Sequence, residues 1–297
     1  MAVQSVKAKI NGQTVNLTYN DGTGFWEATT TAPTSSSYNQ PGHYYGVEIT
    51  ATDDSGNDTT INASTGDFQE ECQLVVKEKV VPVITINSPT SGAHITNNKP
   101  TIQFSITDDD SGVDPDTITV KIDNGSAIST GITKTPSGKG YTCSYTPETA
   151  LGDGSHTIYI NASDHDGNAA AQKSVQFTVD TVAPTLNISS PADNLKTNED
   201  SVTVSGTTND ATSSPVTLTI NGGPVTVQSN GSFSKVVNLT EGENTITIIA
   251  TDSAGKSTTI VRHVTKDTGA PVFVSVEIVD NPVDAGDTYV IRVKVTD

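Results

Sequence analysis

The sequence predicts an all-β protein that consists of tandem β-sandwich domains, and two repeated patterns support this prediction. A strand that begins with proline recurs at Pro82, Pro184 and Pro271, with spacings of 102 and 87 residues (184 − 82 and 271 − 184). These spacings match the usual length of a seven-stranded sandwich. Pro and Gly also interrupt the chain too often for long helices, and no apolar stripe of helical period is present.

The second repeated pattern is a β-hairpin. Apolar side chains occupy every second position of a strand, which buries one of its faces, and an Asp-x-x-Gly turn then reverses the chain. The pattern occurs three times, with its turn aspartate at Asp53, Asp164 and Asp252. A hairpin is therefore the unit expected in each domain.

Residues 181–268 show the clearest succession of strands. Asn221–Gly222 is a strong signal for a two-residue hairpin turn. The expected buried pairs are Leu186/Ile188, Val202/Val204, Leu218/Ile220, Val225/Val227, Phe233/Val237, Ile246/Ile248 and Ile260/Val264. Seven short strands of this kind predict an immunoglobulin-like sandwich. Residues 81–180 align with this pattern, and their extra length, at 108–116 and 128–139, is expected to form loops.

These alignments divide the chain into four parts. We expect an N-terminal immunoglobulin-like domain at 1–80, a second domain at 81–180, a third at 181–268 and an incomplete further domain at 269–297. The segment Val6–Gly12 matches the third strand of the third domain, so the N-terminal domain is expected to be reduced and to lack two strands. Tandem domains of this kind predict a rod.

The charge balance excludes several partners. The chain has 34 acidic and 16 basic residues and a net charge of −18 at pH 7. Nucleic acids and anionic membranes require clustered Lys and Arg, so neither is expected as a partner. No apolar run of about twenty residues, the length that spans a bilayer, is present. The N-terminus lacks the pattern of a secretory signal, so we expect either that the protein leaves the cell inside a virus particle or that a signal was removed.

Neither a disulfide nor an active site is expected. Cys143 lies between Tyr141 and Tyr145 with the parity of a buried strand face, so Cys143 and Cys72 are interpreted as free thiols. The histidines are spread over different repeats, and none lies in a recognisable arrangement with a nucleophile or metal ligands. They are His43, His94, His156, His165 and His263. No phosphate-binding Gly-rich loop precedes a helix, so we expect no enzyme and no cofactor.

Two acidic loops are weak candidates for calcium, because carboxylate oxygens are the ligands that calcium prefers. The candidates are Asp108, Asp110, Asp114, Asp164 and Asp166. Neither loop completes an EF-hand, and hydrogen bonding within turns is the favoured alternative. Calcium is therefore not expected to be required for folding.

The acids that precede two domain junctions give calcium a second expected place. Asp180 and Asp267 lie close to the Asp-x-x-Gly turns in the predicted fold and resemble the linker acids of cadherin-type domains. If calcium binds, we expect it to stiffen the junctions near Pro184 and Pro271.

Aromatic residues in the N-terminal part are candidates for sugar binding. Trp26, Tyr38 and Tyr44 are close in sequence, and a sugar face can stack on exposed aromatic rings. Burial in a core is the favoured alternative, in particular for Trp26 and Tyr45.

Short motifs resemble two groups of immunoglobulin-like proteins. Val204–Thr207, Ser229–Phe233 and Gly242–Ile246 resemble bacterial immunoglobulin-like repeats of surface proteins and of glycoside-hydrolase accessory domains. The opening Met1–Val3 and the run His43–Tyr45 resemble immunoglobulin-like proteins encoded near tail genes of phages and prophages of Gram-positive gut bacteria. The first resemblance implies the fold, and the second implies a place on a virion.

The function expected from these observations is structural. We expect a non-enzymatic spacer or decoration of a phage tail that aids attachment to a bacterial surface. A cell-surface or secreted adhesin stalk and a carbohydrate-binding accessory module of an enzyme remain as alternatives. The expected partners are other structural proteins of the particle or bacterial surface glycans and proteins. Head-to-tail self-association is a further possibility, because strands 272–278 and 289–295 resemble those that the N-terminal domain lacks.

Overall fold

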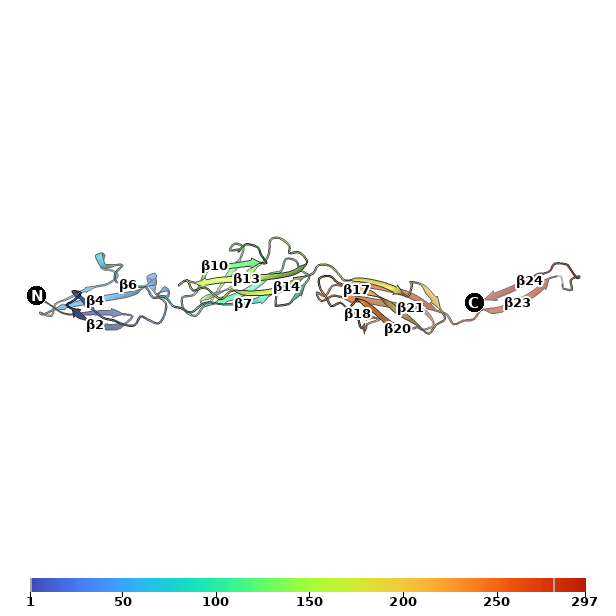
Figure 1. The fold of residues 1–297 in the computed structure, drawn as a ribbon, viewed down its shortest axis with the longest axis horizontal. Coiled ribbons are helices and arrows are strands. Elements are labelled where there is room, and N and C mark those ends of the chain that lie inside the picture. Colours follow the sequence, from blue (N-terminus) through green and yellow to red (C-terminus); the bar gives the residue numbers. More distant parts are fainter. Residues whose placement is uncertain (1, 280) are drawn as a thin grey trace. The chain divides into compact units, whose positions relative to one another are not determined.

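The computed structural model describes residues 2–279 and 281–297. These residues form strands, turns and loops, with three short 3-10 helices at Ser37–Asn39, Pro41–His43 and Gly66–Phe68. The all-β prediction is therefore confirmed. The chain divides into two compact units, Met1–Val179 and Asp180–Asp297, and each unit contains its own sheets (Figure 1).

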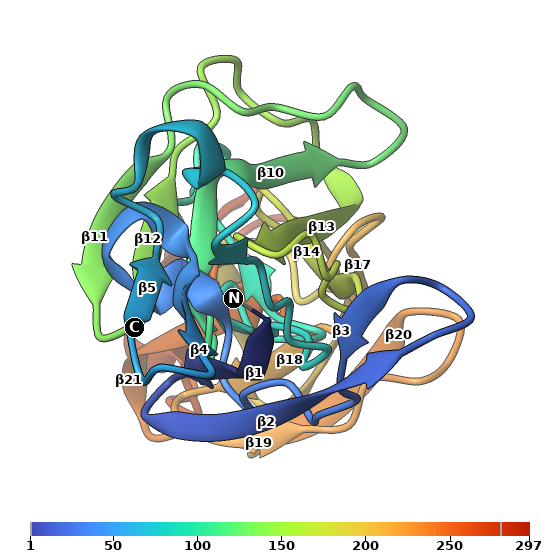
Figure 2. The same cartoon turned by 90° about the vertical axis from the view of Figure 1, so that its left-hand side faces the viewer.

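The N-terminal sheet, formed by strands β1 to β6, opens the first unit. Its strand order is β3-β2-β1-β4-β5, and β6 also pairs with β4. Strands β2, β1 and β4 are visible at the front of Figure 2. The strands are β1 (Val3–Ile10), β2 (Gln13–Asn20), β3 (Phe25–Glu27), β4 (Tyr45–Asp53), β5 (Asp58–Ile61) and β6 (Gln73–Leu74). Val6 is buried, whereas Ile10, Leu17 and Val47 are only half-buried.

The first sandwich, strands β7 to β14, completes this unit. Its two sheets have the orders β10-β13-β14-β8 and β11-β12-β9-β7. The strands are β7 (Val83–Ser88), β8 (His94–Ile95), β9 (Ile102–Thr107), β10 (Val113–Ile122), β11 (Thr133–Ser137), β12 (Gly140–Tyr145), β13 (Gly154–Asp164) and β14 (Lys173–Val179). Inward side chains of both sheets form one core, in which Phe104, Ile158 and Phe177 are at most 1% exposed.

The second sandwich, strands β15 to β22, lies in the second unit. Its sheets have the orders β15-β17-β20 and β16-β22-β21-β18-β19. The strands are β15 (Thr185–Ser190), β16 (Leu195–Thr197), β17 (Ser201–Asn209), β18 (Thr217–Ile220), β19 (Gly223–Val225), β20 (Ser232–Asn238), β21 (Gly242–Thr251) and β22 (Ser257–Lys266). Val204, Ile248 and Val264 are fully buried between the sheets. Both sandwiches have the immunoglobulin-like arrangement that the sequence predicts.

The predicted Asn-Gly hairpin is confirmed. Asn221 and Gly222 have φ angles of 48° and 75°, and they connect Ile220 to its partner Gly223. A two-residue turn with positive φ at both positions favours Asn followed by Gly, because these residues tolerate the left-handed region. The predicted counterpart in the N-terminal sheet, Asn11–Gly12, has the same geometry, with φ angles of 46° and 77°.

Two predicted loops are partly wrong. Strand β10 starts at Val113, so the end of the expected loop 108–116 belongs to a strand, and Val113 and Asp114 pair with β13. Within the expected loop 128–139, β11 pairs with β12 over its whole length. The alternation in β11 is concealed because its half-buried residue, Lys134, is polar, and its ammonium group donates to the Pro115 carbonyl. Side-chain polarity alone therefore misses this edge strand.

The chain after the second sandwich forms one hairpin. Strands β23 (Val272–Val279) and β24 (Val290–Thr296) pair in antiparallel fashion, close to the two strands that the sequence predicts. Their side chains are largely exposed; Phe273 is 71% exposed and Ile291 is 57% exposed.

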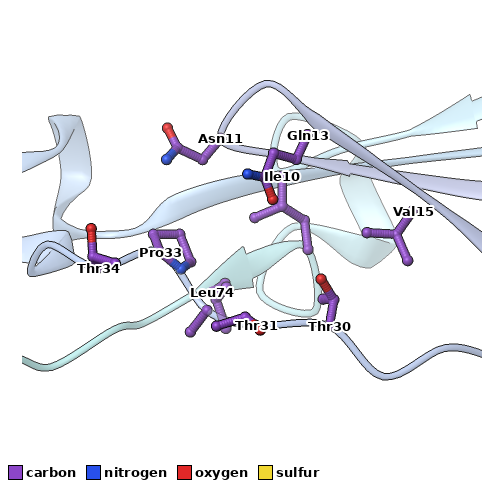
Figure 3. A pocket seen from close by; sticks show the side chains of 10 residues that line it. Ile10, Asn11, Gln13, Val15, Thr30, Thr31, Pro33, Thr34 and Leu74 are labelled. Carbon is purple, nitrogen blue, oxygen red and sulfur yellow. The ribbon is translucent and has the colours of Figure 1, made fainter.

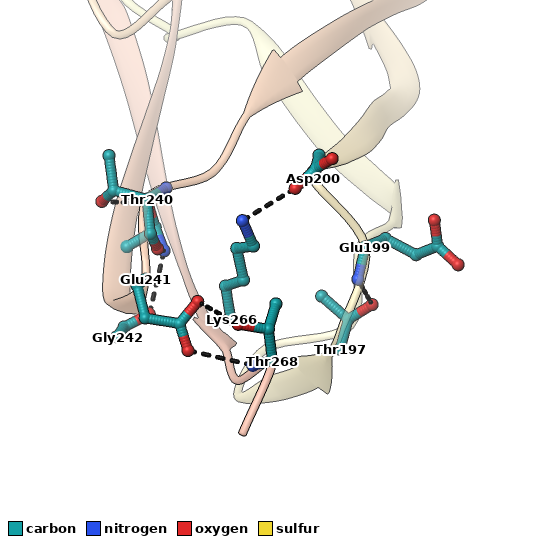
Figure 4. A network of polar contacts seen from close by, with 9 residues as sticks. Thr197, Glu199, Asp200, Thr240, Glu241, Gly242, Lys266 and Thr268 are labelled. Carbon is teal, nitrogen blue, oxygen red and sulfur yellow. Dashed lines mark hydrogen bonds and ion pairs between the residues drawn. The ribbon is translucent and has the colours of Figure 1, made fainter. Parts of the chain in front are cut away.

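A polar network fixes the chain where it leaves the second sandwich (Figure 4). Lys266 Nζ donates to Asp200 Oδ1 at 2.8 Å. Glu241 accepts hydrogen bonds from the backbone N–H and the hydroxyl of Thr268, at 2.9 and 3.0 Å. Asp200 and Glu241 directly precede β17 and β21. The end of β22 and the residues that follow it are thus held against two loops of the same sandwich.

Both cysteines are free and buried, as predicted, with Cys143 2% exposed and Cys72 1% exposed. Over the described residues, no helix has the length and apolar character needed to cross a membrane.

Candidate functional site: two clusters of buried carboxylates

Three carboxylates meet inside the first sandwich. Glu78 lies in the segment that leads into β7, Asp108 directly follows β9, and Asp164 ends β13. Each supplies one oxygen, and the three oxygens all lie within 4.8 Å of one another. The exposed fractions are 8% for Glu78, 8% for Asp108 and 2% for Asp164. We name these three residues the first cluster.

Backbone and amide donors orient the aspartates of the first cluster. Asp108 Oδ1 accepts from the N–H groups of Asp110 and Gly112, at 3.0 and 2.7 Å. Asp164 Oδ2 accepts from the side-chain amide of Asn168 at 2.8 Å. The other oxygen of Asp108, Oδ2, is buried and has no hydrogen-bond partner. One buried oxygen of the cluster therefore has no hydrogen-bond partner.

The surroundings of Glu78 shift the pKa of its carboxyl group. Burial raises the pKa of Glu78 above its usual range, and the negative charge of Asp108 adds to this effect. Hydrogen bonds from the Val80 N–H at 2.6 Å and the Ser111 hydroxyl at 3.1 Å act in the opposite direction. The net direction shows that the surroundings of Glu78 disfavour its negative charge.

Three further carboxylates meet in the second sandwich, and we name them the second cluster. Asp180 precedes β15, Asp210 directly follows β17, and Asp252 directly follows β21. Their oxygens also lie within 4.8 Å of one another. Asp180 is fully buried, and Asp210 and Asp252 are 8% and 6% exposed.

The second cluster has two unsatisfied oxygens. Asp180 Oδ1 accepts from the Val182 N–H at 3.1 Å, and Asp252 Oδ1 accepts from the Lys256 N–H at 2.9 Å. The Oδ2 atoms of both residues are buried and have no hydrogen-bond partner. Asp210 Oδ1 is oriented by backbone N–H groups, one of them that of Thr212 at 2.8 Å.

The two clusters occupy equivalent positions of the two sandwiches. The first member is an acid four residues before the proline of the opening strand, Glu78 before Pro82 and Asp180 before Pro184. The second is the aspartate that directly follows the partner strand of that opening strand. The third is the aspartate of the Asp-x-x-Gly turn. The same three-carboxylate geometry is therefore built twice.

The carboxylates of both clusters lack the usual compensation of a buried charge. Within the described ranges, none of the six takes part in an ion pair. Burying carboxylates is costly, and like charges at such a separation oppose each other's ionisation. A set of oxygen donors without His or Cys suits a hard cation such as calcium or magnesium.

The predicted calcium candidates fall into two groups. Asp108 and Asp164 belong to the first cluster, whereas Asp110, Asp114 and Asp166 lie outside it. Asp114 Oδ1 accepts from the N–H two residues later, at 2.9 Å, which is the turn role that the sequence favours.

Asp110 and Asp166 contact the N-terminal part of the chain instead. Asp110 Oδ2 accepts from the Ser36 N–H at 2.8 Å, and Asp166 Oδ2 accepts from the Glu78 N–H at 2.9 Å. Both bonds connect the first sandwich to the chain that precedes it.

The sequence prediction missed Glu78, Asp210 and Asp252 as members of clusters. Asp180 was expected to act as a linker acid, and it lies in the second cluster; Asp267 instead accepts from the Gly269 N–H at 2.9 Å. The distance of four residues between an acid and the proline, which Glu78, Asp180 and Asp267 share, is the sequence signal that could have drawn attention to Glu78.

The three aromatic candidates do not form one platform. Tyr38 stacks on His43 and on His165, with ring centroids 4.2 and 3.9 Å apart, so both of its ring faces are covered. Trp26 is half-buried and packs on Tyr19 at 5.6 Å, and Tyr44 is also half-buried. Tyr38 therefore has no free ring face for a sugar.

A pocket of about 410 Å³ lies on the N-terminal sheet. Figure 3 shows Ile10 and Val15 on one side of it, with Thr31 and Leu74 opposite. None of its lining side chains is ionisable. Its chemistry offers apolar contacts and hydroxyl groups, but no acid or base.

The histidines make separate contacts. His156 Nδ1 lies 2.8 Å from Asp123 Oδ2, and His263 Nδ1 lies 3.2 Å from Asp193 Oδ1. Neither pair includes a Ser or Cys nucleophile.

These features define a protein of tandem immunoglobulin-like domains. Residues 83–181 match the bacterial Ig-like domain family, and residues 184–268 match the family described as glucodextranase, domain B. Over 109 residues the chain is 36% identical to Bacillopeptidase F of Bacillus subtilis (strain 168). This match covers 37% of the chain and 7% of that protein.

Several solved structures are similar to the chain at low sequence identity. Fibronectin(III)-like modules of Clostridium thermocellum CbhA are 19% identical, with a TM-score of 0.37, and the match covers 63% of this chain and 95% of theirs. The Escherichia coli adhesin FdeC is 14% identical, with a TM-score of 0.35 and 74% of each chain covered. A tetra-tandem repeat from the extending region of a large adhesion protein is 18% identical, with a TM-score of 0.33, over 99% of this chain and 81% of that one.

Proposed function

We propose that this protein is a non-enzymatic spacer of immunoglobulin-like domains, carried on a phage tail or another part of a virion, where it aids attachment to a bacterial surface. The observation that supports a spacer is the pair of separately closed cores. Phe104 and its neighbours fill the first sandwich, and Val204 and its neighbours fill the second. A domain with its own core keeps its shape when only its ends are held.

The virion is proposed as the location on the basis of two sequence motifs. The opening Met1–Val3 and the run His43–Tyr45 resemble immunoglobulin-like proteins encoded near phage tail genes. The acidic surface, with a net charge of −18, is compatible with a soluble decoration. Its partners would be structural proteins of the particle or glycans and proteins of the bacterial surface, and head-to-tail association of the chain stays a prediction.

The location can be tested on purified particles. An antibody raised against the chain is used on particles from a density gradient, on cell-wall fractions and on culture supernatant. Co-sedimentation with tails, and labelling of tails in electron micrographs, is expected. Recovery of the protein only in the wall fraction or the supernatant would reject the proposed location on a virion.

A module of a longer bacterial protein, either a cell-surface or secreted adhesin stalk or an accessory carbohydrate-binding module of an enzyme, is the second candidate. It is favoured by the 36% identity to a segment of Bacillopeptidase F and by the match of residues 184–268 to glucodextranase domain B. Under this alternative the chain belongs to a longer protein with an adhesive or catalytic part. Mass spectrometry of the native protein distinguishes the two, because peptides from a catalytic domain in the same polypeptide would support the second candidate.

A further inference from the structure

We propose that each of the two carboxylate clusters binds one calcium ion, so that the chain holds two ions in equivalent places. The proposal concerns binding at named residues and holds whichever surface the protein occupies. The first ion is assigned to Glu78, Asp108 and Asp164, and the second to Asp180, Asp210 and Asp252.

The unsatisfied oxygens are the first observation that points to a ligand. Asp108 Oδ2, Asp180 Oδ2 and Asp252 Oδ2 are buried without a hydrogen-bond partner. Turn hydrogen bonds explain the Oδ1 atoms of these residues, which accept from nearby N–H groups, but they leave the Oδ2 atoms unexplained. Buried polar atoms in native proteins are almost always paired, so a partner is missing at these three atoms.

The repeated geometry is the second observation. The equivalent positions converge in both sandwiches, although the local residues differ, with Glu78 in one and Asp180 in the other. Turn chemistry alone does not require an acid four residues before the proline to lie beside two other carboxylates. A shared cation explains why all three positions are acidic in both sandwiches.

Charge and ligand type identify the ion. Three carboxylates carry up to three negative charges, and no cationic side chain within the described residues pairs with them. A donor set of oxygens alone excludes a preference for zinc or copper, which favour nitrogen and sulfur. Calcium accepts irregular geometry and bidentate carboxylates, whereas magnesium requires a near-ideal octahedron and retains most of its water. Carboxylates from three separate segments in a site that is at most 8% exposed therefore favour calcium.

The position of the first member gives the ion a mechanical consequence. Glu78 and Asp180 lie in the segments that lead into β7 and β15, whereas the other two ligands belong to the body of each sandwich. An ion shared by the three attaches the incoming segment to the sandwich. Calcium should therefore protect these segments more than the cores.

Binding can be measured on the full chain after removal of metal with a chelating resin. Calcium chloride is titrated by calorimetry in 150 mM KCl, with equilibrium dialysis as the independent count of ions. Two bound ions per chain and a rise in melting temperature are expected. Binding of no calcium at millimolar concentration, or tighter binding of magnesium than of calcium, would overturn the proposal.

Isosteric variants assign each ion to its cluster. Asp108→Asn and Asp252→Asn keep the side-chain shape and should each lose one ion, with affinity at that cluster reduced at least tenfold. The matched control is Asp109→Asn, which removes the same charge from an exposed position beside the first cluster and should retain two ions. An equal loss of bound calcium in Asp109→Asn would mean that binding depends only on the net charge of the chain, and it would refute the two sites.

The change in melting temperature caused by Asp252→Asn should have opposite signs with and without calcium, and this test does not depend on counting ions. Without calcium, Asp252→Asn removes repulsion between buried charges and should raise the melting temperature of the second sandwich. With calcium present, the same variant should melt below the unmodified chain. A shift in the same direction under both conditions would contradict a bound ion.

Discussion

The first and second clusters share their geometry but differ in how well their oxygens are satisfied. In the first, the amide of Asn168 occupies Asp164 Oδ2 and one oxygen remains free; in the second, Lys256 stands in place of that asparagine, and Asp252 Oδ2 is free together with Asp180 Oδ2. The difference teaches that the side chain four residues after the turn aspartate decides whether the second oxygen of that aspartate has a hydrogen-bond donor. The second cluster therefore has one more buried oxygen without a hydrogen-bond partner than the first.

The largest expected effect tests whether the two sandwiches are independent. Phe104→Ala removes a fully buried ring of the first core and should destabilise that sandwich by about 3–5 kcal/mol. Scanning calorimetry should show its transition at lower temperature and that of the second sandwich unchanged. Phe25→Ala, at a ring that is 70% exposed, is the matched control and should shift neither transition. A shift of both transitions by Phe104→Ala would show that the sandwiches unfold together.

A thiol reports on opening of the first sandwich alone. Burial raises the pKa of Cys143 to about 11, with Lys134 acting weakly in the opposite direction. In a Cys72→Ser background, its reaction with a disulfide reagent at pH 8 should be at least about 100-fold slower than that of a free thiol. Denaturant should abolish this protection. Fast labelling of the native chain would show that β12 opens readily.

A substitution at Lys256, four residues after Asp252, tests directly why the two clusters differ in their hydrogen bonds. Lys256→Asn supplies the amide that Asn168 supplies in the first sandwich, and should stabilise the calcium-free second sandwich by about 1 kcal/mol, because Asp252 Oδ2 gains a donor. Thermal melts in chelator measure this effect. Lys256→Ala removes the same charge without an amide, so an equal gain in that variant would attribute the effect to charge.

The smallest expected effect is a pH dependence confined to the first sandwich. Burial lowers the pKa of His156, but hydrogen bonds to the Gly152 carbonyl and the Asp123 carboxylate outweigh it, and the net direction is upward. A raised folded-state pKa contributes stability that is complete below the unfolded value of about 6.5 and is lost as pH rises through the folded value.

The size of this contribution is below about 1 kcal/mol, because the pair is partly exposed. Melting of the first sandwich at pH 5.5 and pH 8.5 should therefore differ slightly more in the unmodified chain than in His156→Gln. An identical pH difference in both chains would exclude His156 as its source.

Sequence periodicity predicts most of the fold, because one face of each strand is buried. The Pro-initiated strands, the Asn-Gly turns and the buried parity of Cys143 all depend on local alternation or turn chemistry, and each is confirmed. Strand β11 (Thr133–Ser137) escaped prediction because an edge strand with polar side chains has no alternation to detect.

The clusters could be predicted only in part. Asp108 and Asp164 lie in visibly acidic loops, but Glu78, Asp210 and Asp252 stand among neutral or mixed neighbours. Their convergence depends on how strands distant in sequence pair across the sheets, and local pattern does not contain that information. For Tyr38, the stack with His165 requires the contact between the N-terminal part and the first sandwich, which the sequence also leaves open.

The short parallel pairings in the two sandwiches determine how each would respond to a stretching force. His94 and Ile95 of β8 pair with β14, and Leu195–Thr197 of β16 pairs with β22, so in both sandwiches a strand near the beginning runs parallel to the last one. Tension on the two ends of a sandwich would slide these strands along each other, which loads their hydrogen bonds together in shear rather than one after another. Each sandwich is therefore arranged to resist extension as a unit. The pairing of β16 with β22 is longer than that of β8 with β14, so more hydrogen bonds must break together in the second sandwich.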